Sequence, residues 1–249
     1  MSGHNRWTKI KHKKEAQGAA KGKLFTKLIK ELTVAARMGG GDPAGNARLR
    51  AAIDAGKEAN MPQDNITRAI KKGTGELEGV SYEEATYEGY GPGGVAMMVE
   101  CLTDNKNRTA GDVRTCFAKG GGHLAAEGAV AWNFERSGVV EVKPGPSEDL
   151  VTEAAIDGGA EDVLNHGADG FEVRTHPNDL HAVVDALEKR KLKIGARRIT
   201  FLPKEAVKVS DPDKARHLLK LIGELEDLDD VQHVHANYEI EDALLDQLA

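Results

Sequence analysis

The fold of this chain is decided by residues 137–203, SGVVEVKPGPSEDLVTEAAIDGGAEDVLNHGADGFEVRTHPNDLHAVVDALEKRKLKIGARRITFLP. Alternating apolar and polar residues predict strands over 139–143, 161–165, 171–175 and 196–202. The intervening segment 148–157 has a helical period, as does the segment in which Leu180, Val183, Val184 and Leu187 recur. The resulting order, strand–helix–strand–strand–helix–strand, is that of an α/β plait.

The segments on either side of this unit have similar patterns, but neither is complete. Residues 82–135 supply two strands, a helix over about 109–119 and a further strand over 129–135, in which Val130, Trp132 and Phe134 share a face. Residues 205–240 add a strand, a helix and a strand. We therefore expect these two segments to form a second plait together, with the first plait inserted into it.

The first 78 residues are helical in pattern and contain no predicted strand. The apolar stripe of residues 23–37 predicts an amphipathic helix. Asp42, followed by Pro43, predicts the N-cap of a second helix. A third helix starts at Pro62 and ends at Gly73.

The expected fold class is thus multidomain α+β, with an N-terminal helical domain and two ferredoxin-like (α/β plait) domains, one inserted in the other. The expected boundaries are 1–78 for the helical domain, 79–136 with 204–249 for the outer plait, and 137–203 for the inserted plait. Hydrophobic residues make up 40% of the chain, which is enough for packed cores, and aromatic residues only 4%. The cores must therefore be mainly aliphatic.

Charge is distributed unevenly along the chain. Residues 1–72 contain 16 Lys and Arg against 6 Asp and Glu, whereas residues 73–249 contain 18 against 34. Such asymmetry indicates a polyanion-binding arm on an acidic body. The alternative is a solvated charged tail that binds nothing.

The N-terminal sequence MSGHNRWTKIKHKK interleaves cations with aromatic rings. Cations neutralise phosphates and rings stack on bases, and RNA suits this combination best because its unpaired bases are accessible. A disordered tail, with Trp7 and Ile10 packed on the helical domain, is the alternative. The residues expected to bind nucleic acid are His4, Arg6, Trp7, Lys9, Lys11, His12, Lys13, Lys14, Lys21, Lys23 and Lys27.

A second candidate phosphate site lies where the polar loop 103–109 enters a helix, with Thr109 as the expected cap. Its candidate contacts are Lys106, Arg108 and Arg114, because a helix N-terminus with nearby cations attracts anions. A solvated cap with exposed bases explains the same residues at least as well.

Other patterns argue against catalysis, cofactors and metals. The glycine-rich stretch 89–94 precedes a strand and not a helix, so it predicts a tight connection between strands. His233 and His235 are expected to meet solvent, Cys101 and Cys116 to pack in or near the core, and the carboxylates of 148–162 and 224–246 to be solvated. With no apolar run long enough for a membrane helix and no secretory signal, we expect a cytoplasmic protein.

Three long stretches carry a resemblance to a known family. They are KLFTKLIKELTVAARMGGGDPAGNARLRAAIDAGKEANMPQDNITRAIKKGTG, YEGYGPGGVAMMVECLTDNKNRTAGDVR and GAVAWNFERSGVV, and with MSGHNRWTKIKHKK they resemble the YebC family. This family includes mitochondrial translational activators of cytochrome oxidase and bacterial proteins called probable transcriptional regulators. The resemblance implies a helical domain before two α/β domains, nucleic-acid binding, a cytoplasmic location and no catalytic activity.

Three hypotheses follow for the function. The preferred one is a non-enzymatic translation factor that binds ribosomal RNA and assists elongation through difficult stretches such as consecutive prolines, an activity the resemblance implies. The second is a DNA-binding transcriptional regulator, although no convincing base-reading recognition helix is visible in the helical domain. The third, an enzyme with a pocket between the α/β domains, lacks a nucleophile, metal cluster or cofactor loop. No membrane partner or small-molecule substrate is expected.

Overall fold

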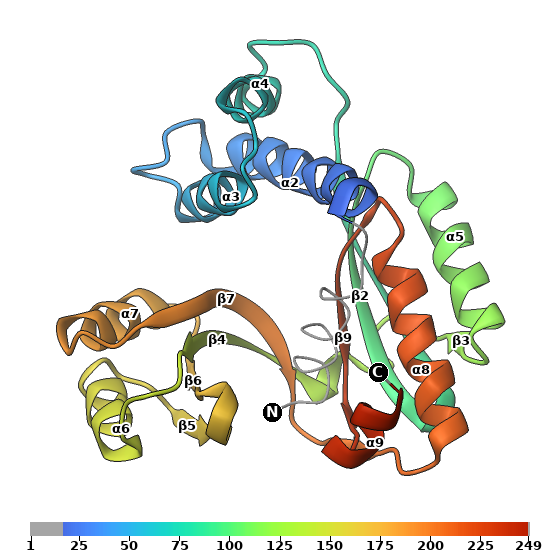
Figure 1. Ribbon diagram of the computed structural model, residues 1–249. Coiled ribbons are helices and arrows are strands. Elements are labelled where there is room, and N and C mark those ends of the chain that lie inside the picture. Colours follow the sequence, from blue (N-terminus) through green and yellow to red (C-terminus); the bar gives the residue numbers. More distant parts are fainter. Residues whose placement is uncertain (1–16, 249) are drawn as a thin grey trace.

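The computed structural model describes residues 17–248 (Figure 1). Its N-terminal part is a bundle of the three helices α2 (Gln17–Gly39), α3 (Ala47–Glu58) and α4 (Gln63–Thr74). Helix α2 packs against both of the others, and the small core between them is aliphatic, with Leu32, Leu49 and Ile66 fully buried. The predicted three-helix region is confirmed.

The N-cap of α3 differs from the prediction. The cap is Asn46, whose Oδ1 accepts the N–H of Leu49 at 3.0 Å, whereas Asp42 accepts the N–H of Ala44 in the turn before it. The buried amide of Asn46 also donates to the carbonyl oxygens of Ala35 and Gly40, each at 2.8 Å. Contacts with α2, which local sequence does not reveal, therefore place the start of α3.

The outer unit is built on an antiparallel sheet of β1 (Glu83–Gly91), β2 (Val95–Thr103), β3 (His123–Leu124) and β9 (Val231–Ala236), in the order β3-β1-β2-β9. Two helices, α5 (Lys106–Lys119) and α8 (Pro212–Glu226), cover one face of the sheet, as Figure 1 shows. The unit is completed by the short parallel pair β8 (Val207–Lys208) and β10 (Tyr238–Glu239), and by α9 (Asp242–Leu248).

The sequence pattern explains which face of this sheet is covered. Alternate residues of β2, from Val95 to Cys101, pack with Phe117 of α5 and the aliphatic residues of α8. The glycine-rich stretch 89–94 joins β1 to β2 through the 3₁₀ turn Pro92–Gly94, where Gly93 and Gly94 both have positive φ. The prediction of a tight connection between neighbouring strands is confirmed.

The central part of the chain forms the second antiparallel sheet. Its strands are β4 (Phe134–Val142), β5 (Asp162–Asn165), β6 (Phe171–Thr175) and β7 (Ile194–Pro203), in the order β5-β6-β4-β7. The helices α6 (Glu148–Asp157) and α7 (Leu180–Lys189) share one core with this sheet. A mixed α+β protein with a helical N-terminal region and antiparallel sheets is therefore confirmed.

The predicted strand 129–135 is wrong. Ala131–Asn133 form a 3₁₀ turn, and β4 starts only at Phe134 and runs on to Val142. Val130 and Phe134 are buried as expected, but Trp132 is 63% exposed. The backbone N–H groups that a strand would use for pairing instead donate to the carboxylate of Glu88.

The three parts are arranged like a letter C (Figure 1). The outer unit is the back of the letter, and the helical bundle and the central sheet unit project from it on the same side. Between the tips of the two arms, a guanidinium nitrogen of Arg197 on β7 lies 3.9 Å from a carboxylate oxygen of Asp54 on α3. None of the helices described between residues 17 and 248 has the length and apolar character required to cross a membrane.

Candidate nucleic-acid interface

The predicted nucleic-acid contacts of the N-terminal arm lie outside the described residues. They are His4, Arg6, Trp7, Lys9, Lys11, His12, Lys13 and Lys14. Their roles stay predictions. The described part of the basic region begins with α2, and its cations divide into two groups according to their partners.

The lysines of α2 face the C-terminal end of α8. The Nζ of Lys27 donates to the carbonyl oxygen of Glu226 at 2.6 Å, and the Nζ of Lys23 lies 3.4 Å from a carboxylate oxygen of Asp227. Both the acidic side chain and the unpaired carbonyls at a helix C-terminus favour a cation there. Lys21 has a different neighbour, with its ammonium 5.5 Å from the centroid of the Phe25 ring. Two of these three predicted contacts thus also hold α2 against the outer unit.

One turn further along α2, Lys30 is buried in an ion pair that the sequence did not predict. Its Nζ lies 2.5 Å from Oδ1 of Asp230, at the start of β9, and both side chains are at most 10% exposed. The other carboxylate oxygen of Asp230 accepts from Arg108 at 2.8 Å and from Thr109 at 2.7 Å. The carboxylates of 224–246 were expected to be solvated, and for Asp230 this expectation is wrong. Asp230 is buried and joins the helical bundle to the outer sheet.

The electrostatics of this cluster keep Asp230 ionised. Burial alone would raise the pKa of its carboxyl group, but the hydrogen bonds from Arg108, Lys30 and Thr109 outweigh burial and lower that pKa to about 2. A buried pair of this kind contributes only while both partners stay charged. The docking of α2 on the outer unit thus depends on the charges of Lys30 and Asp230, which are 200 residues apart in sequence.

Two arginines of the helical bundle also serve docking. Arg48 makes a two-point contact with Glu31, at 2.6 and 3.0 Å, and reaches Glu84 on β1 at 2.7 Å. Hydrogen bonds and the charge of Glu31 raise the pKa of Arg48 further above its ordinary value. Arg37 donates to the hydroxyl of Ser81 and to the carbonyl of Tyr82.

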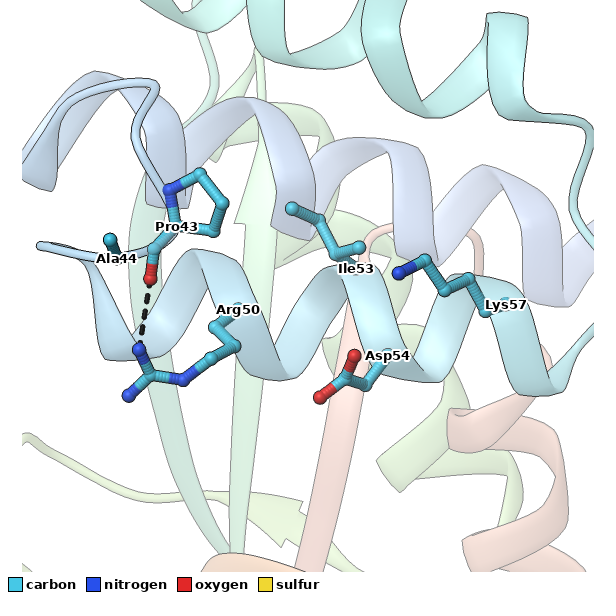
Figure 2. A pocket seen from close by; sticks show the side chains of 6 residues that line it. All are labelled: Pro43, Ala44, Arg50, Ile53, Asp54 and Lys57. Atoms are coloured by element: carbon cyan, nitrogen blue, oxygen red, sulfur yellow. Dashed lines mark hydrogen bonds between the residues drawn. The ribbon is translucent and has the colours of Figure 1, made fainter.

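The second group of cations is exposed on α3 and α4. Arg50 and Lys57 of α3 lie on one face with Asp54 between them, as Figure 2 shows, and line a shallow hollow of about 300 Å³ with Pro43, Ala44 and Ile53. Arg50 donates to the carbonyl of Pro43 at 3.0 Å and thereby closes one end of the hollow.

The exposed cations of α4 are Arg68, Lys71 and Lys72. Their spacing of three and four residues puts them on the same side of the helix. Within residues 17–248, no acidic side chain pairs with these three or with Arg50 and Lys57. These five cations were not among the predicted contacts, although the helical spacing in RAIKK was a signal that could have identified those of α4.

The candidate phosphate site at α5 is already filled by protein groups. The N-cap of α5 is Asn105 and not Thr109, since Asn105 Oδ1 accepts the N–H of Arg108 at 3.1 Å. Lys106 pairs with Glu83 at 2.8 Å, and Arg108 pairs with Asp104 as well as Asp230. Arg114 is exposed and has no partner among the described residues.

The histidines of β9 give a mixed outcome. His233 is exposed, as predicted, but His235 is only 6% exposed, which corrects the prediction that it meets solvent. Its Nε2 lies 2.7 Å from Oε2 of Glu100, and its Nδ1 lies 3.5 Å from the hydroxyl of Thr200 on β7. The face of the outer sheet opposite α5 and α8 is therefore covered at this point by β7, a long-range contact that the alternating pattern of β9 cannot reveal.

The described residues were predicted to hold no metal and to keep both cysteines in or near the core. No group of three or more His, Cys, Asp or Glu residues in the described range is placed to hold a metal ion. Cys101 is buried, and burial raises the pKa of its thiol to about 12, so it is a poor nucleophile. The half-buried Cys116 thiol also has a raised pKa because of burial. Their predicted packing in and near the core is confirmed.

Comparison with known proteins places both parts of the chain in one family. Residues 5–76 match the family model described as "TACO1/YebC protein N-terminal domain", and residues 82–238 match "TACO1/YebC second and third domain".

Relatives resemble the chain over its full length. A protein of Myxococcus xanthus named "Probable transcriptional regulatory protein" is 62% identical over 248 residues, which is 100% of this chain and 99% of that protein. A protein of Persephonella marina with the same name is 51% identical over 250 residues, covering 100% of both chains. The crystal structure of the conserved hypothetical protein Aq1575 from Aquifex aeolicus superposes with a TM-score of 0.82 at 50% identity, covering 90% of this chain and 93% of that one. The chain belongs to the TACO1/YebC family.

Proposed function

We propose that this protein is a non-enzymatic, nucleic-acid-binding regulator of gene expression that uses its basic helical region as the binding surface. The observation that carries the proposal is the group of exposed cations on α3 and α4, Arg50, Lys57, Arg68, Lys71 and Lys72, none of which forms an ion pair with an acidic side chain of the described residues. Cations left unpaired on an otherwise acidic protein are available to phosphates. The N-terminal arm, with Arg6, Trp7 and its lysines, extends this set.

Within this proposal, ribosomal RNA is the preferred target, and the protein acts in the cytoplasm as a translation factor. The arm alternates cations with rings, a combination suited to unpaired bases. The acidic remainder of the chain repels the phosphates of a long duplex that extends beyond the helical region, so a short or single-stranded target is favoured. The hollow lined by Arg50, Asp54 and Lys57 is shallow and open, which does not suit an enclosed small-molecule substrate.

The predicted contacts differ in how free they are to bind RNA. We retain Lys21 and Arg114 as proposed contacts, because neither has an acidic partner among the described residues. The arm residues, which lie outside the described range, are retained as well. Lys23, Lys27, Lys106 and Arg108 contact RNA only if they exchange their present protein partners for phosphates.

A DNA-binding transcriptional regulator is the second candidate, and one feature of the structure favours it. Helices α3 and α4 are joined by only four residues, Ala59–Pro62, and α4 exposes Gln63, Asp64 and Thr67 in its first turns. A recognition helix reads bases with residues near its N-terminus. The name of the two relatives, "Probable transcriptional regulatory protein", fits this candidate as well.

Sedimentation with ribosomes separates the two candidates. A tagged full-length protein is centrifuged with ribosomal subunits, and in parallel its retention on genomic promoter DNA is measured at the same salt concentration. Co-sedimentation that resists competition by duplex DNA supports the translation factor. Retention on particular promoters without co-sedimentation supports the transcriptional regulator.

We also propose that the two sheets with their helices are ferredoxin-like plaits, with residues 137–203 inserted into an outer unit of 79–136 and 204–249. The order β5-β6-β4-β7 of the central sheet is that of a plait, and each sheet has a pair of helices on one face. In the outer unit the neighbouring strands β1 and β2 are consecutive in the chain, so its connections differ from those of the central unit. The ends of the central unit lie together, because Phe134 of β4 pairs with Pro203 of β7.

A further inference from the structure

Trp132 has an unusual position for a tryptophan. Its side chain is 63% exposed, and it is the one aromatic residue among the exposed large hydrophobic side chains of the described chain. An exposed indole leaves a large apolar surface in water, a cost in free energy that the fold does not recover.

The turn that carries Trp132 is held by a buried carboxylate. Glu88 on β1 is 6% exposed and accepts backbone N–H groups from Gly128 and Val130, both at 2.7 Å, and from Ala131 at 2.8 Å. Burial raises the pKa of Glu88, but these three hydrogen bonds outweigh it and the net shift is downward. A charged acceptor shared by three donors within four residues fixes the backbone immediately before Trp132.

The other end of the turn is fixed by two buried amides. Asn133, 3% exposed, exchanges two hydrogen bonds with the backbone of Glu205, at 2.9 and 3.1 Å. Asn237, also buried, donates to the same Glu205 carbonyl at 3.0 Å and accepts the N–H of Ala96 at 2.7 Å. The backbone is therefore anchored on both sides of Trp132, while the side chain between the anchors points out of the core.

The polar edge of the indole is satisfied within the protein. Its Nε1–H donates to the carbonyl oxygen of Ala129 at 2.9 Å, and the hydroxyl of Tyr90 donates to the same oxygen at 3.2 Å. The Tyr90 ring in turn lies 5.6 Å from the ring of His123. Because the N–H is already bonded, the ring is held in one orientation and offers a partner its π-face instead of a donor.

We propose that Trp132 is a stacking platform for an unpaired base of single-stranded RNA, a second contact that rests on the proposed RNA binding by the helical region. The exposed neighbours of Trp132 in sequence include the charged residues Glu127, Glu135 and Arg136. Lys204 also lies next to the turn, because its backbone N–H donates to the carbonyl oxygen of Asn133. An apolar protein partner would need a contiguous hydrophobic patch, and Trp132 has no exposed large hydrophobic neighbour between residues 121 and 140. An unpaired base needs only the face of the indole ring for stacking. Arg136 and Lys204 are then available to the backbone phosphates on either side of that base.

The chain offers a direct probe, because Trp7 and Trp132 are its two tryptophans. In full-length W7F protein, Trp132 is the only indole, and its fluorescence is followed while a single-stranded oligouridylate is added. We expect quenching that saturates with binding, which is measured independently by the anisotropy of a labelled oligouridylate. In the otherwise wild-type protein, Trp132→Ala should weaken that binding by about 5- to 100-fold, the worth of one stacked base, and Trp132→Phe should restore most of it.

A matched control is Ile156→Ala, since Ile156 on α6 is exposed to a similar extent, at 66%. It should leave both affinity and melting temperature unchanged, and W132A should leave the melting temperature nearly unchanged too. If the wild-type protein binds but W132A binds equally well and Trp132 emission does not respond, the stacking proposal is overturned while the proposed function stands. If the wild-type protein does not bind RNA at all, both are overturned.

Discussion

Asn46 illustrates how one side chain positions part of the candidate interface. It caps α3, the helix that carries Arg50 and Lys57, and it satisfies two carbonyl oxygens around the end of α2. The neighbouring position 39 has room only for glycine, because a Cβ added to Gly39 would lie 2.6 Å from the side-chain amide nitrogen of Asn46. The local sequence favoured Asp42 as the cap, since the Asp-Pro pair is a strong helix-start signal and the contacts of Asn46 with α2 are not visible in sequence.

Replacing Asn46 by Ala should therefore lower the free energy of unfolding by about 2–3 kcal/mol, the sum of a lost cap and of buried carbonyls left without a donor. Asp42→Ala, which removes only the turn contact to Ala44, should cost about 0.5 kcal/mol. Urea unfolding of both variants measures the difference. Equal costs for the two variants would contradict the assignment of the cap.

Asp230 is the residue whose charge holds the helical bundle on the outer unit. Asp230→Asn leaves the ammonium of Lys30 buried without its counter-charge, and we expect a loss of about 3 kcal/mol in stability. The exposed pair of Lys23 and Asp227 provides the control, because Asp227→Asn should change stability by less than about 1 kcal/mol. A D230N protein as stable as D227N would show that the buried cluster does not hold the bundle in place.

The cluster also predicts a pH dependence. The folded-state pKa of Asp230, about 2, lies below the ordinary value of 3.8, so the stabilisation is complete above about pH 4 and disappears as the pH falls towards 2. Thermal unfolding between pH 5 and 2 should therefore show a steeper loss of stability for the wild-type protein than for D230N. Parallel curves over this range would contradict the assignment.

At the scale of elements, regular segments were predictable and segments set by distant contacts were not. Helix α6 and strand β6 have the predicted bounds, because each buries one face in a core and its period is unbroken. The turn at Ala131–Asn133 was predicted as a strand, since Val130, Trp132 and Phe134 alternate correctly. What overrides the pattern is Glu88, more than 40 residues earlier, which takes the backbone donors that pairing would need.

The charge pattern alone does not show which cations are free to bind a polyanion. The excess of basic residues indicates the N-terminal third of the chain, but formal charge does not distinguish a paired cation from a free one. Lys30 and Arg48 are committed to Asp230 and to Glu31 and Glu84, partners that only the tertiary structure brings near. The surface left for a polyanion is therefore displaced from α2 towards α3 and α4.

At the scale of the whole molecule, the long strands β4 and β7 connect the central sheet to the outer unit. Phe201 of β7 packs against the small cluster of Ala96, Met98, Val130 and Phe134 on the open face of the outer sheet. The strand ends are paired at Phe134 and Pro203, so a chain from which the segment between Glu135 and Lys204 is removed can be rejoined by a short flexible linker.

We expect the rejoined outer unit to unfold cooperatively, with its stability reduced by the loss of Phe201, a large apolar contact worth about 3 kcal/mol. Residues 134–203 expressed alone should also unfold cooperatively, because they retain their own core. Circular dichroism with thermal melting checks both fragments. A broad, non-cooperative transition in both would mean that the two sheets depend on each other for folding.

The central claim is that free cations of the helical region bind nucleic acid, and the salt dependence of RNA binding tests it most directly. The variant R68Q/K71Q/K72Q removes the exposed cations of α4, and K189Q/K191Q/K193Q removes three exposed lysines of the central unit with the same change in net charge. If the α4 cations contact phosphates, the slope of log affinity against log salt on single-stranded RNA falls by about 2 for the first variant, roughly 0.7 per lost contact, and is unchanged for the second. Equal slopes for the wild-type protein and both variants would contradict the claim.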